Sequence, residues 1–272
     1  MLNVSLAPRV LFYIAGFPVT NTLLWTVIIS IAVMVVFVWV ARRMKKVPGP
    51  LQNLIELLVE ESYNFMNTVT GSEKKTRRLF PFIFTLFIFI LLGNLLTFLP
   101  GQSALTIEKA GGVVPLFRSI MSDYGLIFVM TLIGIITAQI VAIAVHGPFG
   151  YIGKFINLKG FKDFFKSIFQ GQVKFSLLGQ GFLDLFLGVM DLVGEVAKIV
   201  SLSFRLFGNM FASEVITSVM LFLAPFFVPL PFKFLGLLTA VVQAFVFAVL
   251  TLIYITMASE IEEDEIAEEA TI

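Results

Sequence analysis

The sequence predicts an all-α membrane protein that crosses the bilayer about five times and has amphipathic helices at the interface. Hydrophobic residues make up 58% of its 272 residues, and the mean hydropathy of +0.97 is far above that of a soluble globular domain. Several apolar runs reach the length of about 20 residues at which a helix spans a hydrocarbon core about 30 Å thick. Most charged residues lie between these runs, as expected of loops and interfacial segments.

Missing residue types exclude several functions. The chain has no cysteine and one histidine, His146, so we expect no disulfide and no metal site. It contains no P-loop and no nucleophile–base constellation, so we expect neither catalytic residues nor a cofactor. The net charge of +1 is divided among loops and predicts no nucleic-acid partner. The first twenty residues lack the pattern of a cleaved signal peptide.

Apolar runs and helix breakers predict the order of the elements. Breaks fall at Pro48-Gly49-Pro50 and at Pro100-Gly101. The seven acids of the C-terminal tail predict a solvated, partly disordered end. The predicted elements are transmembrane helices at 23–41, 80–99 and 125–145, a cytoplasmic interfacial helix at 51–69, a basic interfacial segment at 154–175, a long tilted helix at 181–223, a closing helix at 232–258 and an acidic tail at 260–272.

The distribution of basic residues predicts the orientation. Residues 42–78 contain eight Lys and Arg, and residues 154–174 contain five lysines. The opposite loops contain only four basic residues. Basic loops favour the cytoplasmic side, so we expect the N-terminus outside and, after five crossings, the C-terminus in the cytoplasm.

The helix predicted at 181–223 is too long for a bilayer and has an unusual polar stripe. At 1.5 Å per residue it would measure roughly 65 Å, so it must tilt, bend or run along the interface. Charged residues recur every seven positions, which drifts by only about 20° per step. Such a stripe must face protein or water. Its members are Asp184, Asp191, Lys198 and Arg205, with Glu195 and Asn209 beside them.

Arg205 is the most informative residue of this stripe. A lone arginine at membrane depth costs at least about 2.5–3.5 kcal/mol on insertion scales. A ladder within the helix, such as Glu195–Lys198, is a purely structural alternative that also fits Asp184 and Asp191. It does not fit Arg205, which has no acidic residue three or four positions away. Arg205 is therefore predicted to be functional.

Other polar residues on the predicted helices are less specific. Glu214 lies nine residues after Arg205, half a turn around the helix, so it must face a different wall or cavity. Asn94, taken alone, fits hydrogen bonding between helices better than a functional role. Gln139 and His146 are given no functional role. On the closing helix, a stripe of Gly236, Gln243, Leu250 and Tyr254 fits either a close helix seam or a channel wall.

Five segments resemble subunit a of F-type ATP synthases, in matching order and spacing. The most specific is S-L-S-F-R-L-F-G-N-M-F-A-S-E at 201–214, the end of a longer match over 195–214. The run Q-A-F-V-F-A-V-L-T-L-I-Y at 243–254 resembles the closing helix of the family. The other three are F-P-V-T-N-T at 17–22, G-P-L-Q-N-L-I-E at 49–56 and G-N-L-L-T-F-L-P at 93–100.

This resemblance implies a stator subunit that couples proton flow through two offset half-channels to rotation of a c-ring. Arg205 resembles the essential arginine that faces the c-ring carboxylate, and Gln243 the glutamine near it. Asn209, Glu214 and Asn94 resemble half-channel residues. The last two helices would then form a long tilted hairpin against the ring.

With the predicted orientation, Glu214 belongs to the outer half-channel, and Asp191, Glu195 and Lys198 to a cytoplasmic one. The implied partners are the c-ring (subunit c), subunit b of the peripheral stalk and the remainder of the F1Fo complex, with membrane lipid around them. The implied location is the bacterial cytoplasmic membrane, with an organellar inner membrane as the alternative. Both H⁺ and Na⁺ fit, because the c-ring largely sets the coupling ion.

The chain departs from the family pattern at three positions. Ser213 stands where glycine is common, Thr97 where some members have an acid, and Gly236 where some have a histidine. The competing class is a secondary transporter or channel in which Arg205 binds an anionic substrate. Such a protein should show inverted repeats with broken helices in both halves, and the sequence shows none.

Overall fold

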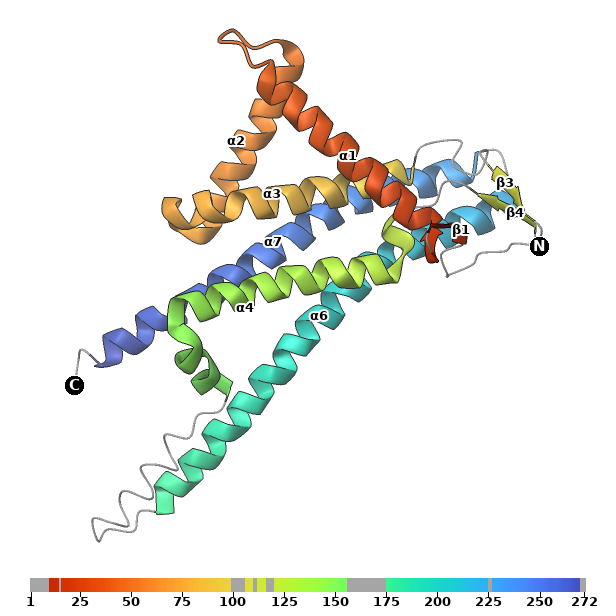
Figure 1. Ribbon diagram of the computed structural model, residues 1–272. Coiled ribbons are helices and arrows are strands. Elements are labelled where there is room, and N and C mark those ends of the chain that lie inside the picture. The colour runs from red at the N-terminus through yellow and green to blue at the C-terminus, as the bar shows by residue number, and fades with distance from the viewer. Residues whose placement is uncertain are drawn as a thin grey trace. The chain divides into compact units, whose positions relative to one another are not determined.

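The computed structural model describes residues 10–14, 16–98, 106–109, 112–115, 120–155, 175–224 and 227–269. These residues are almost all helical, which confirms the predicted all-α membrane class (Figure 1). Two small antiparallel hairpins were not predicted. Strand β1 (Val10–Ile14) pairs with β2 (Phe17–Thr20), and β3 (Thr106–Lys109) pairs with β4 (Gly112–Pro115). Strands of four or five residues are too short to give a clear period-two pattern.

Helix α1 (Asn21–Arg42) is the first predicted span, and it begins two residues earlier than expected. Thr20 caps it, because its hydroxyl accepts the backbone N–H of Leu23 at 3.2 Å. The hydroxyls of Thr26 and Ser30 donate to carbonyls four residues back, so these polar side chains are satisfied within an apolar helix.

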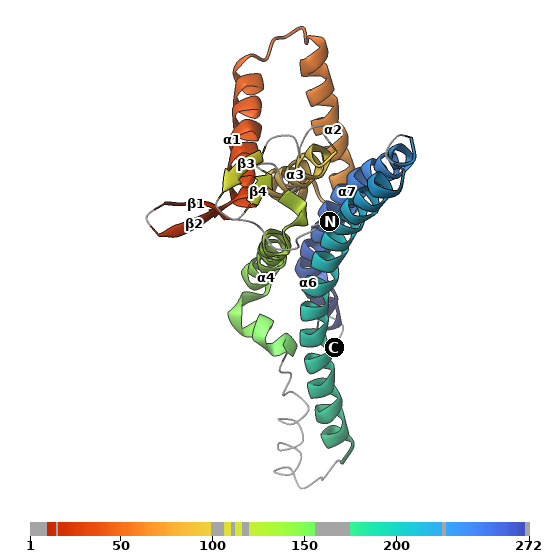
Figure 2. The same cartoon turned by 90° about the vertical axis from the view of Figure 1, so that its right-hand side faces the viewer.

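A turn at residues 43–49 joins α1 to α2 (Pro50–Thr70), and Figure 2 shows the two helices running antiparallel on either side of it. The amide of Gln52 fastens the turn by pairing with both the N–H and the carbonyl of Lys45, at 3.0 and 2.9 Å. A second tight turn follows, in which Gly71 adopts the left-handed conformation that favours glycine, with φ of 63°.

Helix α3 (Glu73–Leu96) begins seven residues before the predicted span at 80–99. The added turns contain lysines and arginines, which are good helix formers. The predicted start at residue 80 is therefore the point where the sequence becomes apolar, whereas the helix itself begins at the turn before Glu73. The hydroxyl of Thr76 bonds Asn67 at 3.2 Å and so ties α3 back to α2.

Helix α4 (Tyr124–Phe155) follows a short 3-10 helix, Ile120–Ser122, and includes the span predicted at 125–145. Its helical path breaks at Gly147, where φ is 73° and ψ is 162°. Asp123 connects the start of α4 to α1: its carboxylate accepts the N–H of Gly125 at 3.0 Å and the hydroxyl of Thr22 at 2.8 Å. Most of the basic segment predicted at 154–175, namely 156–174, lies outside the described residues.

Helices α6 (Phe175–Leu223) and α7 (Pro229–Glu269) correspond to the two last predicted helices. Helix α6 begins six residues before the predicted start at 181. Helix α7 continues to Glu269, through most of the tail that was predicted to be partly disordered. Residues 259–269 contain no glycine or proline, so nothing in their sequence stops the helix.

Among the described residues, four helices are long and apolar enough to cross a membrane by length and composition: 21–42 of α1, 73–96 of α3, 124–145 of α4 and 229–259 of α7. Helix α6, with its stripe of charged residues, remains a predicted fifth crossing. The chain forms two compact units, the first made of residues 1–130 and 203–253 and the second of 131–202 and 254–272. Helices α4, α6 and α7 contribute to both units.

Candidate functional site

In the first unit, α6 and α7 pack as an antiparallel pair. The side-chain amide of Asn209 donates to Oε1 of Gln243 at 2.8 Å. Four residues later on α6, Ser213 faces Gly236, which lies seven residues earlier on α7. Gln243 is only 5% exposed, so this amide pair joins the two helices in a largely buried setting. Two predicted site residues are thereby in direct contact.

Arg205 lies one turn before Asn209 on α6 and is exposed. Among the described residues it forms no hydrogen bond and no ion pair. The surface around it is apolar or small, with Phe204, Gly208 and Ala212 also exposed. A Cβ added at Gly208 would meet nothing within 4 Å. The guanidinium thus lies on an open helix surface that another helix could approach closely.

Asn94 of α3 is fully buried against α7. Its Nδ2 donates to the carbonyl of Ala240 at 2.9 Å, one turn before Gln243. Its Oδ1 accepts no hydrogen bond from a described residue. A buried acceptor without a donor is costly, on the order of 1–3 kcal/mol. Asn94 therefore forms the predicted hydrogen bond between helices. Its Oδ1 is a buried acceptor to which no described residue donates.

Glu214 is half-buried, whereas Arg205 is exposed, in agreement with the half-turn that separates them on α6. The preceding residue, Ser213, faces Gly236 of α7. A Cβ added at Gly236 would lie 2.3 Å from Oγ of Ser213 and 2.8 Å from the ring of Phe98. Two departures from the family pattern, Ser213 and Gly236, are thus neighbours, and a side chain at position 236 would force Ser213 or Phe98 to shift.

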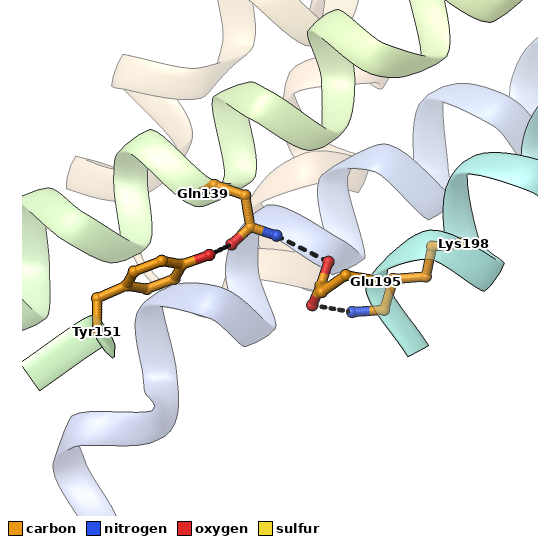
Figure 3. A network of polar contacts seen from close by, with 4 residues as sticks. All are labelled: Gln139, Tyr151, Glu195 and Lys198. Carbon is orange, nitrogen blue, oxygen red and sulfur yellow. Dashed lines mark hydrogen bonds and ion pairs between the residues drawn. The ribbon is translucent and has the colours of Figure 1, made fainter. Parts of the chain in front are cut away.

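The second unit contains a network of polar side chains from α4 and α6 (Figure 3). Nζ of Lys198 pairs with Oε1 of Glu195 at 2.8 Å, the contact expected of a ladder within the helix. Nε2 of Gln139 donates to the other carboxylate oxygen at 2.7 Å. The hydroxyl of Tyr151 donates to Oε1 of Gln139. Nζ of Lys198 also lies 5.2 Å from the centre of the Tyr254 ring.

Sequence reasoning missed Gln139 and Tyr151. A side-chain amide within an apolar span indicates a polar partner on a neighbouring helix, because the amide needs a hydrogen-bond partner there. Its partner, Glu195, is 56 residues away, so nothing local identified it. Burial, and then the charge of Glu195, raise the pKa of Tyr151, which lies beyond the apolar part of α4. Asp184 is half-buried and Asp191 exposed, and neither forms an ion pair with a described residue.

The described residues contain no group of acids or histidines able to hold a metal ion. What the fold and site define is a polytopic membrane protein that presents an arginine on an exposed, apolar helix surface beside buried amides. The family model described as ATP synthase A chain matches residues 23–256. The chain belongs to this family.

Individual relatives agree with this assignment. ATP synthase subunit a of Moorella thermoacetica is 32% identical, over 91% of this chain and 94% of the relative. ATP synthase subunit a 2 of a Picosynechococcus species is 30% identical, over 94% and 93%. The sodium ion specific ATP synthase subunit a of Propionigenium modestum is 30% identical, over 88% and 74%.

Family membership confirms the resemblance found in the sequence. The protein is a membrane subunit of the Fo sector of an ATP synthase, which conducts ions and is not itself catalytic. The competing class, a transporter for an anionic substrate, has no support in these matches.

Proposed function

We propose that this subunit conducts protons through two offset half-channels and couples their flow to rotation of a c-ring through Arg205. The observation that carries this proposal is the guanidinium of Arg205, exposed among apolar and small residues with no described partner. A charge in this environment calls for an opposite charge from another molecule. The carboxylate of a c-ring subunit is such a charge, and Gly208 and Ala212 leave room for its helix.

The mechanism follows from the cost of burying charge. A ring carboxylate that faces lipid is protonated, because the ionised form is expensive in hydrocarbon. Beside Arg205 the ionised form becomes favourable, so the proton leaves into one half-channel. The next carboxylate takes a proton from the other. The fixed cation also opposes the direct passage of a proton between the half-channels.

Polar residues of α6 on either side of Arg205, together with Asn94 of α3 and Gln243 of α7, suggest the two paths. Asn94, Asn209, Gln243 and Glu214 supply buried or half-buried polar groups on the outer side. Asp191, Glu195 and Lys198 supply polar groups on the cytoplasmic side. This assignment uses the orientation predicted from the basic loops, with the N-terminus outside and the C-terminus in the cytoplasm of a bacterium.

The remaining proposals concern partners and the coupling ion. We infer contacts with the c-ring and with subunit b of the peripheral stalk. The relative from Propionigenium modestum is described as sodium ion specific, so membership of the family does not select H⁺ over Na⁺. ATP-driven pumping that requires Na⁺ and resists a protonophore would overturn our choice of H⁺.

Replacing Arg205 tests the proposal. In the complete ATP synthase, Arg205→Ala and Arg205→Lys should both abolish ATP-driven proton pumping in inverted membrane vesicles. The lysine variant should fail because an ammonium lacks the planar fork of donors and deprotonates more easily when buried. Arg43→Ala, which removes another exposed arginine, is the matched control and should pump normally. Normal pumping by either Arg205 variant would refute the proposal.

A further inference from the structure

Glu195 is held from two helices. Lys198, on its own helix, occupies one carboxylate oxygen, and Gln139 of α4 occupies the other (Figure 3). The side chain of Glu195 is 18% exposed and that of Lys198 is 35% exposed, so the carboxylate is the better shielded partner. An ion pair at i,i+3 near solvent is weak and leaves its side chains mobile. The contact with Gln139 therefore fixes where the carboxylate lies.

The amide of Gln139 can serve this purpose only in one orientation. A carboxylate accepts hydrogen bonds, so Gln139 must turn its NH₂ group toward Glu195. The hydroxyl of Tyr151 donates to Oε1 of Gln139, so the amide is held at both of its ends. If Tyr151 lacked its hydroxyl, the oxygen of Gln139 would lose this donor, and the side chain would be held only by its contact with Glu195.

The backbone of α4 explains how Tyr151 reaches Gln139, twelve residues earlier. Gly147 lies between them with φ of 73° and ψ of 162°, a conformation that is essentially restricted to glycine. The helical path therefore turns at Gly147, and the residues after the turn bring Tyr151 back toward the same helix. Figure 3 shows the hydroxyl of Tyr151 directed toward Gln139, and the amide of Gln139 directed toward Glu195.

We propose that Gln139 and Tyr151 are positioning residues for ion translocation, which orient the Glu195 carboxylate in the cytoplasmic half-channel. This inference rests on the proposed function and extends it to two residues of α4. Tyr151 acts through Gln139, and Gln139 acts through Glu195. The three form one chain of hydrogen bonds, so removing any link should have the same consequence as removing the next.

The test compares variants of the complete ATP synthase in inverted membrane vesicles, at matched subunit levels. Tyr151→Phe and Gln139→Leu should each lower the initial rate of ATP-driven proton pumping at least about threefold, and the double variant should be no worse than Gln139→Leu. In a Glu195→Gln background, Tyr151→Phe should have no further effect. Thr137→Val is the control and should pump normally, because among the described residues the exposed hydroxyl of Thr137 bonds only the carbonyl of Ile133 in its own helix.

A pH profile separates positioning from a general packing role. Gln139→Glu would place two carboxylates in contact, which favours sharing of one proton between them. Pumping by this variant should approach the wild-type rate at pH 6 and fall as the pH rises to 8. Among the described residues, the other titratable groups near Glu195 are Lys198, Tyr151, Tyr254 and, four residues away along α6, Asp191. A loss that is equal at both pH values would contradict the inference.

The outcomes distinguish this inference from the proposed function. If Tyr151→Phe and Gln139→Leu pump like Thr137→Val while Glu195→Gln is impaired, the two residues do not position the carboxylate. If Glu195→Gln is normal, the inference is also wrong, although the role of Arg205 stands. If Arg205→Ala pumps normally, the proposed function itself fails.

Discussion

At the scale of single residues, the site is divided between groups that the sequence singles out and groups that only the fold brings together. Arg205 is conspicuous in the sequence because it is a charge without an acidic neighbour in an apolar helix. Its neighbour Asn209 and the distant Gln243 were predicted from the family resemblance, and their contact is visible only in the structure. Gln139 was given no functional role, because the sequence alone does not reveal which residue its side-chain amide contacts.

The amide pair should behave as a unit. Asn209→Ala and Gln243→Ala each leave the other amide with an unsatisfied polar group, so each should lower the thermal stability of the purified subunit. The double variant should be less damaging than the sum, with a coupling energy of about 0.5 kcal/mol or more. Strict additivity in the double-mutant cycle would show that the 2.8 Å contact contributes nothing.

Tyr151 should titrate at an unusually high pH. Its pKa is raised by burial and by the charge of Glu195, so the neutral phenol persists above the ordinary range near pH 10. The stability that this shift contributes is complete below the unfolded pKa and is lost as the pH rises through the higher folded pKa. Ultraviolet difference titration of the wild type against Tyr151→Phe measures it. A midpoint at or below that of an exposed tyrosine would contradict the raised pKa.

At the scale of elements, the sequence predicted which helices exist better than where they end. Apolar runs located the cores of α1, α3, α4 and α7, because burial in hydrocarbon requires about 20 apolar residues. Helix hydrogen bonding does not stop where hydropathy falls, so α3 begins at Glu73 and α7 continues to Glu269. The β1–β2 and β3–β4 hairpins were missed because a few residues cannot display a strand period.

The packing of α6 against α7 depends on the absence of a side chain at Gly236. Gly236→Ala places a methyl group against Ser213 and Phe98, and such overpacking costs about 1–3 kcal/mol. Its melting temperature in detergent should therefore fall, and Ser213→Gly should restore part of the loss by removing the nearest atom. Gly194→Ala in α6, where an added Cβ meets nothing within 4 Å, is the control. If Gly236→Ala lowered the melting temperature equally with and without Ser213→Gly, the close fit of Gly236 against Ser213 would be disproved.

At the scale of the whole molecule, the charges of the loops and the length of α6 predict the arrangement in the membrane. Basic residues gather at 42–78 and at 154–174, and the positive-inside tendency predicts the orientation of the first crossings. Helix α6 has 49 residues, about 74 Å at 1.5 Å per residue, so it cannot stand upright within hydrocarbon. If it rises from the cytoplasm as predicted, Glu214 lies toward the outer face and Asp191 toward the cytoplasm.

This orientation can be tested directly because the chain has no cysteine. A single cysteine at position 214 should react with an impermeant thiol reagent applied from the outer face, and one at position 191 with the reagent applied from the cytoplasmic face. Each position needs contact with water, because a carboxylate is tolerated at membrane depth only beside water or a partner. A cysteine in place of Met34, an exposed apolar position in the middle of α1, should react slowly from both sides and serves as the lipid-facing control. Reaction of position 214 only from the cytoplasmic face would reverse the topology and exchange the two half-channels, while leaving the role of Arg205 unaltered.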